Sequence, residues 1–175
     1  MLTLNANINS DAVSARLSDR WLGLSRVVAQ AFLLASLLFA TSAVMASSNV
    51  HLKVYQDPNC GCCGAWVDYM KAEGFNVQAI KTSDVTAYKQ QFGVPPKLAS
   101  CHTAVVEETG QVIEGHVPAD DIKALLEERP EVAGLAVPGM PHGSPGMETG
   151  REDDYAVLSW TRDSQPPEIF REYIQ

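Results

Sequence analysis

The chain has 175 residues, of which 46% are hydrophobic and 19% are charged, and its formal net charge is −8 at pH 7. This acidic surplus argues against nucleic acid or anionic lipid as a partner, because both are themselves negatively charged. It is compatible with a protein that meets cations, and equally with an acidic surface that only keeps the chain soluble.

The N-terminal 46 residues have the pattern of a secretory leader. Three arginines precede the uncharged run VVAQAFLLASLLFATSAVMA at positions 27–46, which ends in the small-x-small pattern Val44-Met45-Ala46. This pattern predicts a signal peptide at residues 1–46, cleaved before Ser47, and hence a periplasmic protein with no membrane attachment afterwards. The alternative is an inner-membrane anchor that faces the periplasm, since about 20 apolar residues can span a bilayer.

Removal of this leader leaves 129 of the 175 residues. The leader takes three of the 13 basic and two of the 21 acidic side chains, so the remainder carries 10 and 19, a net charge of −9. A chain of this length fits one domain with a modest core.

The first predicted elements are a strand and a helix. Residues 47–55 alternate apolar and polar side chains, which predicts a half-buried strand, and an Asp-Pro-Asn turn ends it. Asn59 is a suitable N-cap, and Trp66 and Met70 follow at helical spacing. We therefore expect a helix behind Asn59, with Trp66 and Met70 in the core.

The middle of the chain continues this alternation. Residues 75–80 predict a second strand, and residues 84–92 predict a second helix that ends before a Gly-Val-Pro-Pro stretch. Residues 103–107 and 111–115 form two short strand-like runs around a Glu-Thr-Gly turn, which predicts an antiparallel hairpin. An apolar stripe over residues 118–129 then predicts a third helix.

The resulting order, β-α-β-α-β-β-α, is that of a thioredoxin-like α/β domain, predicted over residues 47–129. Residues 130–154 are too rich in Pro and Gly for a regular element and predict a long loop. Residues 155–161 and 168–174 look like two strands, so we expect an extra C-terminal hairpin, residues 155–175, packed on the core.

Three of the four cysteines lie within four positions, as Cys60-Gly61-Cys62-Cys63. A helix N-terminus favours thiolate over thiol, and thiolate is both the nucleophile of disulfide exchange and a ligand of soft metals. Adjacent helical residues point about 100° apart, so Cys62 and Cys63 are badly placed to hold one ion together. Diverging thiolates suit several bridged ions instead, and Cu(I) is the soft monovalent candidate.

The fourth cysteine is Cys101. In the thioredoxin arrangement the segment just before the third strand lies beside the start of the first helix, and here that segment is Ser-Cys-His-Thr at 100–103. We therefore expect Cys101 to reach the other three sulfurs from across the fold. Because adjacent strand residues point to opposite faces, the ring of His102 is expected to point away from the sulfur of Cys101.

Other interpretations of these cysteines stay open. Four cysteines in a secreted domain can form two structural disulfides, which would leave no free thiol and no metal. Cys60 and Cys63 form a C-x-x-C pair, which predicts a thiol-disulfide oxidoreductase. Zinc is less suitable because paired ligand spacing is absent. Crowding favours a metal, since adjacent cysteines would close a small strained ring.

Four ordered motifs carry a resemblance to a known family: CGCC after the first strand, CHTA before the third, GHVPADDI at the last helix and GMPHGSPGME in the loop. Together they resemble the CopG-type periplasmic copper-resistance family, over roughly residues 50–148. The chain departs from thioredoxins proper by its extra Cys62 and by Cys101-His102, where a Pro-Thr pair would be expected.

The resemblance implies a copper-binding envelope protein in copper homeostasis that holds Cu(I) in a thiolate-bridged multinuclear cluster. Its implied ligands are Cys60, Cys62, Cys63 and Cys101. Interconversion of Cu(I) and Cu(II), and with it a role as copper oxidoreductase, would follow from the same site. Expected partners are copper ions, other envelope copper-resistance proteins or an electron donor.

Weaker candidate ligands lie outside the cysteines. Met140, His142 and Met147 lie in the Pro/Gly-rich loop, and thioether and imidazole are suitable copper ligands. The same side chains are equally compatible with packing of the loop, because Met readily fills irregular gaps. His116 follows the hairpin and is either a ligand or a structural histidine.

Overall fold

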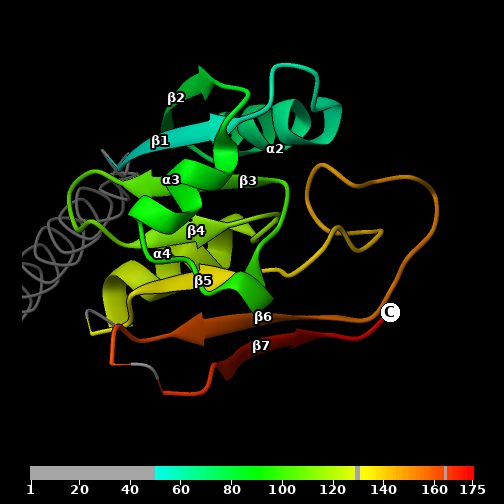
Figure 1. The fold of residues 1–175 in the computed structure, drawn as a ribbon. Helices are drawn as coiled ribbons and strands as arrows, with labels where there is room; N and C mark the ends of the chain where they lie inside the picture. The colour runs from blue at the N-terminus through cyan, green and yellow to red at the C-terminus, as the bar shows by residue number, and fades with distance from the viewer. Residues whose placement is uncertain (1–49, 129–130, 164) are drawn as a thin grey trace, which may run out of the picture. The chain divides into compact units, whose positions relative to one another are not determined.

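The computed structural model describes residues 50–128, 131–163 and 165–175, and the predicted leader lies outside these residues. Its strands are β1 His51–Gln56, β2 Asn76–Lys81, β3 His102–Val106, β4 Val112–Glu114, β5 Gly134–Ala136, β6 Tyr155–Trp160 and β7 Glu168–Tyr173. They form one seven-stranded sheet in the order β2-β1-β3-β4-β5-β6-β7, which runs from top to bottom in Figure 1.

The first four strands and three helices follow the predicted order and confirm the α/β fold class. The helices are α2 Gly61–Ala72, α3 Val85–Gln91 and α4 Ala119–Glu128, with a short 3₁₀ turn at Pro96–Leu98. Strand β1 pairs in parallel with β2 and antiparallel with β3, and β3 pairs antiparallel with β4. The strand β3 therefore runs against its neighbours, as in a thioredoxin-like sheet.

Helices cover both faces of this sheet. One apolar cluster joins α2 and α4 to the sheet through Trp66, Met70 and Ile122, and the two predicted core residues among these are fully buried. On the other face Tyr55 of β1 stacks on Tyr88 of α3, with ring centroids 4.0 Å apart. This alternation follows from the strand period, because neighbouring residues of β1 face opposite layers.

The region after α4 differs from the prediction. The expectation of a loop without regular structure over residues 130–154 is wrong at Gly134–Ala136, which form β5 between β4 and β6. A Cβ at Gly134 would lie 2.2 Å from the carbonyl oxygen of Val112 and 2.4 Å from the Trp160 ring, so only glycine fits there. The predicted C-terminal hairpin is present as β6 and β7, and β5 makes it part of the main sheet.

None of the helices in the described part of the chain is both long and apolar enough to cross a membrane.

Candidate metal centre

Helix α2 begins at the cysteine motif. Its N-cap is Cys60, whose sulfur lies 3.4 Å from the backbone nitrogen of Cys63 and accepts its hydrogen bond. The expectation that Asn59 caps the helix is wrong, because the cap is the next residue, Cys60; the Asn59 backbone N–H donates to the Asp57 carboxylate at 2.8 Å in the preceding turn. Because Asn59 belongs to this turn, the helix begins one residue later than expected, and the sulfur of Cys60 lies at the N-cap position.

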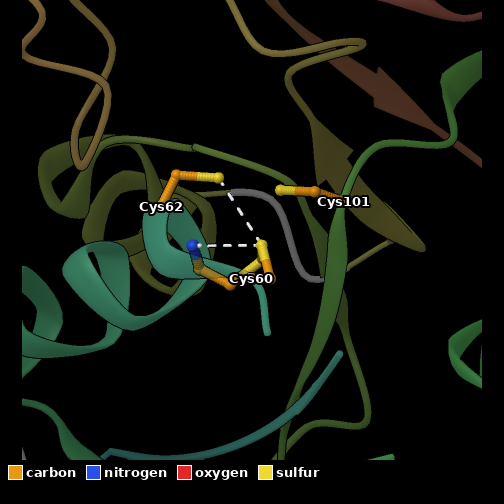
Figure 2. A group of neighbouring side chains, drawn as sticks. Cys60, Cys62 and Cys101 are labelled. Carbon is orange, nitrogen blue, oxygen red and sulfur yellow. Dashed lines mark hydrogen bonds between the residues drawn. A yellow bond between two sulfur atoms is a disulfide. The ribbon is translucent and has the colours of Figure 1, made fainter. Parts of the chain in front are cut away.

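The structure brings the Cys101 sulfur close to the three sulfurs of the CGCC motif, as expected from the sequence. The sulfurs of Cys60, Cys62, Cys63 and Cys101 all lie within 4.8 Å of one another. Figure 2 shows Cys60 and Cys62 at the start of α2, with Cys101 pointing toward them from across the fold. The sulfurs of Cys60 and Cys62 lie 3.5 Å apart.

Two of these cysteines are bonded to each other. Cys60 and Cys63 form a disulfide, whereas Cys62 and Cys101 are free. The interpretation of the four cysteines as two structural disulfides is therefore wrong. A cluster of four thiolates also requires that the Cys60–Cys63 bond be reduced first, which the sequence did not indicate.

Two histidines join Cys101 to form a second group of potential ligands. The Cys101 sulfur lies 3.2 Å from Nδ1 of His102 and 3.1 Å from Nε2 of His116. The expectation that the His102 ring points away from this sulfur is wrong. Cys101 precedes β3, which starts at His102, so the alternation of side chains along a strand does not apply to this pair.

Burial sets the electrostatics of this second group. Burial raises the pKa of the Cys101 thiol to about 12, and the neighbouring Cys62 adds to the shift. Burial also lowers the pKa of His102 well below its usual value, and lowers that of His116 in the same direction. At neutral pH the group therefore consists of a thiol and two neutral imidazoles.

The geometry of the β3–β4 hairpin places His116 beside Cys101. The backbone N–H of Gly115 donates to the carbonyl of His102 at 3.0 Å, and Gly115 has φ +73°. A Cβ at Gly115 would lie 2.4 Å from Oγ of Ser100 and 2.7 Å from the Val137 carbonyl oxygen. The turn into His116 therefore depends on a glycine, since both the positive φ and the close approach exclude a side chain.

A buried ion pair supports the segment that carries Cys101. Glu114 of β4 has no exposed surface, and one of its carboxylate oxygens accepts from Lys89 Nζ at 2.6 Å and from the Ser100 backbone N–H at 2.6 Å. Its other oxygen accepts from the Thr103 hydroxyl at 2.7 Å. The residue before Cys101 is thus fixed by a carboxylate of the neighbouring strand, a relationship that sequence reasoning missed.

The Pro/Gly-rich loop also reaches the thiols, at Met140. Its sulfur lies 4.0 Å from that of Cys62. His142 instead pairs through Nδ1 with the Thr149 hydroxyl at 2.5 Å. The backbone of Met147 donates to Ser144 and accepts from Gly143 and Thr149 within the loop. Among the predicted loop ligands, a contact with a cysteine is thus seen for Met140.

The loop approaches α2 most closely at Gly146. A Cβ there would lie 2.7 Å from the Trp66 backbone nitrogen and 3.0 Å from the Cys62 carbonyl oxygen. The residue before it, Pro145, accepts a hydrogen bond from Nδ1 of His116 at 2.7 Å. The loop therefore contacts both the helix with the CGCC motif and the histidine beside Cys101.

These side chains define a class of protein: an α/β domain of thioredoxin-like topology whose sulfur and imidazole groups form a site suited to a soft metal ion. Two solved structures are similar to this chain, "Copper resistance protein copG- Form 2" and "Copper resistance protein copG- Form 1". Each is 45% identical, with TM-scores of 0.67 and 0.66. The matches cover 72% and 71% of this chain and 99% and 98% of the solved ones.

The chain therefore belongs to the family of the copper resistance protein CopG. A family model described as "Protein of unknown function, DUF411" also matches residues 98–147. No curated protein sequence matches this chain significantly.

Proposed function

We propose that this protein binds copper in the bacterial envelope and holds Cu(I) in a thiolate-bridged multinuclear cluster. The ligands are Cys60, Cys62, Cys63 and Cys101. The observation that carries the proposal is that four sulfurs from two distant segments lie within 4.8 Å of one another. The name of the similar solved structures, a copper resistance protein, supports copper as the metal.

The arrangement of the sulfurs favours several ions over one. Cys62 and Cys63 are adjacent on α2, where neighbouring residues are about 100° apart around the helix axis, so each sulfur is better placed to bridge two ions than to share one with the other. Thiolate is a soft ligand that suits Cu(I), and monovalent ions balance the thiolate charges one by one. His116, Met140, His142 and Met147 are further candidate ligands, and Met140 is the loop residue nearest to a cysteine.

Formation of the cluster requires a redox step, in addition to any later interconversion of Cu(I) and Cu(II). Cys60 and Cys63 exist as a disulfide here, so cluster assembly begins with a two-electron reduction that yields two thiols. Periplasmic location is proposed from the leader at residues 1–46, with inner-membrane anchoring as the alternative. The partners are then copper ions, a reductant of the disulfide and other copper-resistance proteins of the envelope.

Titration with Cu(I) tests this function. The protein is fully reduced, freed of reductant and titrated without oxygen while the thiolate-to-copper absorption is followed. More than one copper per chain is expected, with short copper–copper scattering in X-ray absorption. The matched control is the same protein with the Cys60–Cys63 disulfide intact, which is expected to bind fewer ions. Absence of Cu(I) binding by the reduced protein would contradict the proposal.

One observation favours a second candidate, a thiol-disulfide oxidoreductase. The Cys60–Cys63 disulfide lies at the N-terminus of α2, where the helix favours a thiolate leaving group. Disulfide exchange needs neither Cys62 nor Cys101. Insulin reduction that persists in both Cys62→Ser and Cys101→Ser would favour this activity over copper binding.

A further inference from the structure

We propose that Cys101, His102 and His116 form a second copper site, which shares Cys101 with the cluster. It holds a single ion through one sulfur and two imidazoles while Cys60 and Cys63 are joined in their disulfide. The inference rests on the proposed function for the choice of copper as the metal. It does not depend on the multinuclear cluster, because neither disulfide cysteine takes part.

The distances within this group suit one shared ion. The Cys101 sulfur lies 3.2 Å from Nδ1 of His102 and 3.1 Å from Nε2 of His116. With metal–sulfur and metal–nitrogen bonds of about 2.3 and 2.0 Å, two ligands on one tetrahedral ion lie about 3.5 Å apart. The sulfur needs to separate from each nitrogen by only a few tenths of an ångström to admit a metal.

His116 is already oriented as a ligand. Its Nδ1 lies 2.7 Å from the Pro145 carbonyl oxygen, which can only accept, so Nδ1 carries the hydrogen. The other nitrogen, Nε2, then presents its lone pair to the Cys101 sulfur. Histidines that bind metals are typically held in this way, with the second ring nitrogen donating to a backbone carbonyl.

His102 provides the second, independent observation. Its side chain is fully buried, with Nδ1 facing the Cys101 sulfur, and its Nε2 has no hydrogen-bond partner within the described residues. The nitrogen available to an ion beside Cys101 is Nδ1, which faces the sulfur; the unpartnered nitrogen, Nε2, is not a ligand of the proposed site. Trp66 on one side and His116 on the other hold the ring in place, with centroids 4.5 and 5.1 Å away.

The donor set differs in kind from that of the cluster. When copper binds, the Cys101 thiol releases its proton to solvent. One thiolate with two imidazoles, with or without a distant thioether, is the ligand set of copper sites that cycle between Cu(I) and Cu(II), whereas thiolates alone favour Cu(I). Met140 places a thioether 4.0 Å from the Cys62 sulfur, at the same end of the fold. The disulfide state thus selects between a thiolate cluster and a mixed-ligand single site.

The test uses the oxidised Cys62→Ser protein, in which Cys101 is the one remaining thiol of the four cysteines. Titration with Cu(I) without oxygen is expected to give one copper per chain. X-ray absorption is expected to show a mixed sulfur and nitrogen shell without copper–copper scattering. His116→Ala in this background is expected to weaken binding by at least about tenfold. His51→Ala is the matched control, because the His51 ring pairs with Glu108 and belongs to neither group of potential ligands, and it is expected to leave binding unchanged.

Cys101→Ser in the same background decides the question if His116→Ala fails to fold, because serine nearly preserves the shape of the side chain. It is expected to remove the sulfur signal and most of the affinity. No binding by the oxidised Cys62→Ser protein, undiminished binding after Cys101→Ser, or an all-sulfur shell would each overturn the inference. If the single site forms while the reduced wild-type protein binds no cluster, the proposed cluster alone fails; the reverse result removes only this inference.

Discussion

The sulfur of Cys101 lies 3.1 Å from Nε2 of His116, although 15 positions separate the two residues. Cys101 precedes β3 and His116 follows β4. Because these strands pair antiparallel, the start of β3 and the end of β4 lie side by side, which brings the two residues together. The hairpin thus carries a sulfur and an imidazole to the start of α2. The geometry of this hairpin therefore controls the site.

Gly115→Ala tests the turn next to His116. We expect a loss of about 2 kcal/mol or more in the free energy of unfolding, because φ is +73° and the new Cβ would meet Ser100 and the Val137 carbonyl. Gly110→Ala is the matched control, with φ +71° but open space around it, and should cost only about 1 kcal/mol. Urea unfolding of both variants measures the difference, and equal losses would show that the close approach to Ser100 is unimportant.

The buried Lys89–Glu114 pair gives a second prediction. Lys89→Met should destabilise the protein by about 3 kcal/mol, because it leaves the fully buried Glu114 carboxylate without its counter-charge. The additional change Glu114→Gln should recover part of this loss, since the amide can still accept from the Ser100 backbone. Thermal or urea unfolding measures the series.

Lys53→Met is the control for that experiment. Lys53 pairs with Glu107 at the same distance, 2.6 Å, but both side chains are partly exposed. Solvent screens such a pair, so little change in stability is expected. A loss as large as that of Lys89→Met would mean that burial of Glu114 is not the cause.

The contact between the loop and α2 can be tested at Gly146. Gly146→Ala should speed the reaction of Cys62 with a thiol reagent, because the new Cβ would meet the Trp66 backbone and force the loop away from the helix. Gly150→Ala has the same φ of +83° and no neighbour within 4 Å, so it controls for backbone strain. The rate of thiol modification in the disulfide form is the measurement. Equal rates in the two variants would show that the loop around Gly146 does not limit access of the reagent to Cys62.

Met140 and Met147 provide a matched comparison of thioethers. Met140→Leu should weaken Cu(I) binding, because it removes the sulfur that lies 4.0 Å from Cys62 and keeps the apolar bulk. Met147→Leu is expected to have the smaller effect. Competition with a chromogenic Cu(I) chelator measures both affinities. The opposite ranking would show that copper binding rearranges the loop.

Much of the fold could be predicted from periodicity alone. Trp66 and Met70 follow the helical spacing and are fully buried, and the hairpin of β3 and β4 lies where alternation and a Glu-Thr-Gly turn placed it. β5 was not predicted, because a strand of three residues that begins with Gly134 has no periodic signal. Its position is set by pairing with β4 and β6, which only the folded sheet provides.

The grouping of the four sulfurs could be predicted from local patterns, because CGCC at a strand-to-helix turn and a cysteine before the next strand converge in this topology. The pairing within the group required the folded chain. The fold joined Cys60 to Cys63 and turned His102 and His116 toward Cys101. The physical reason is that these choices depend on distances of a few ångströms between segments far apart in the chain, and on burial, which local sequence patterns do not encode.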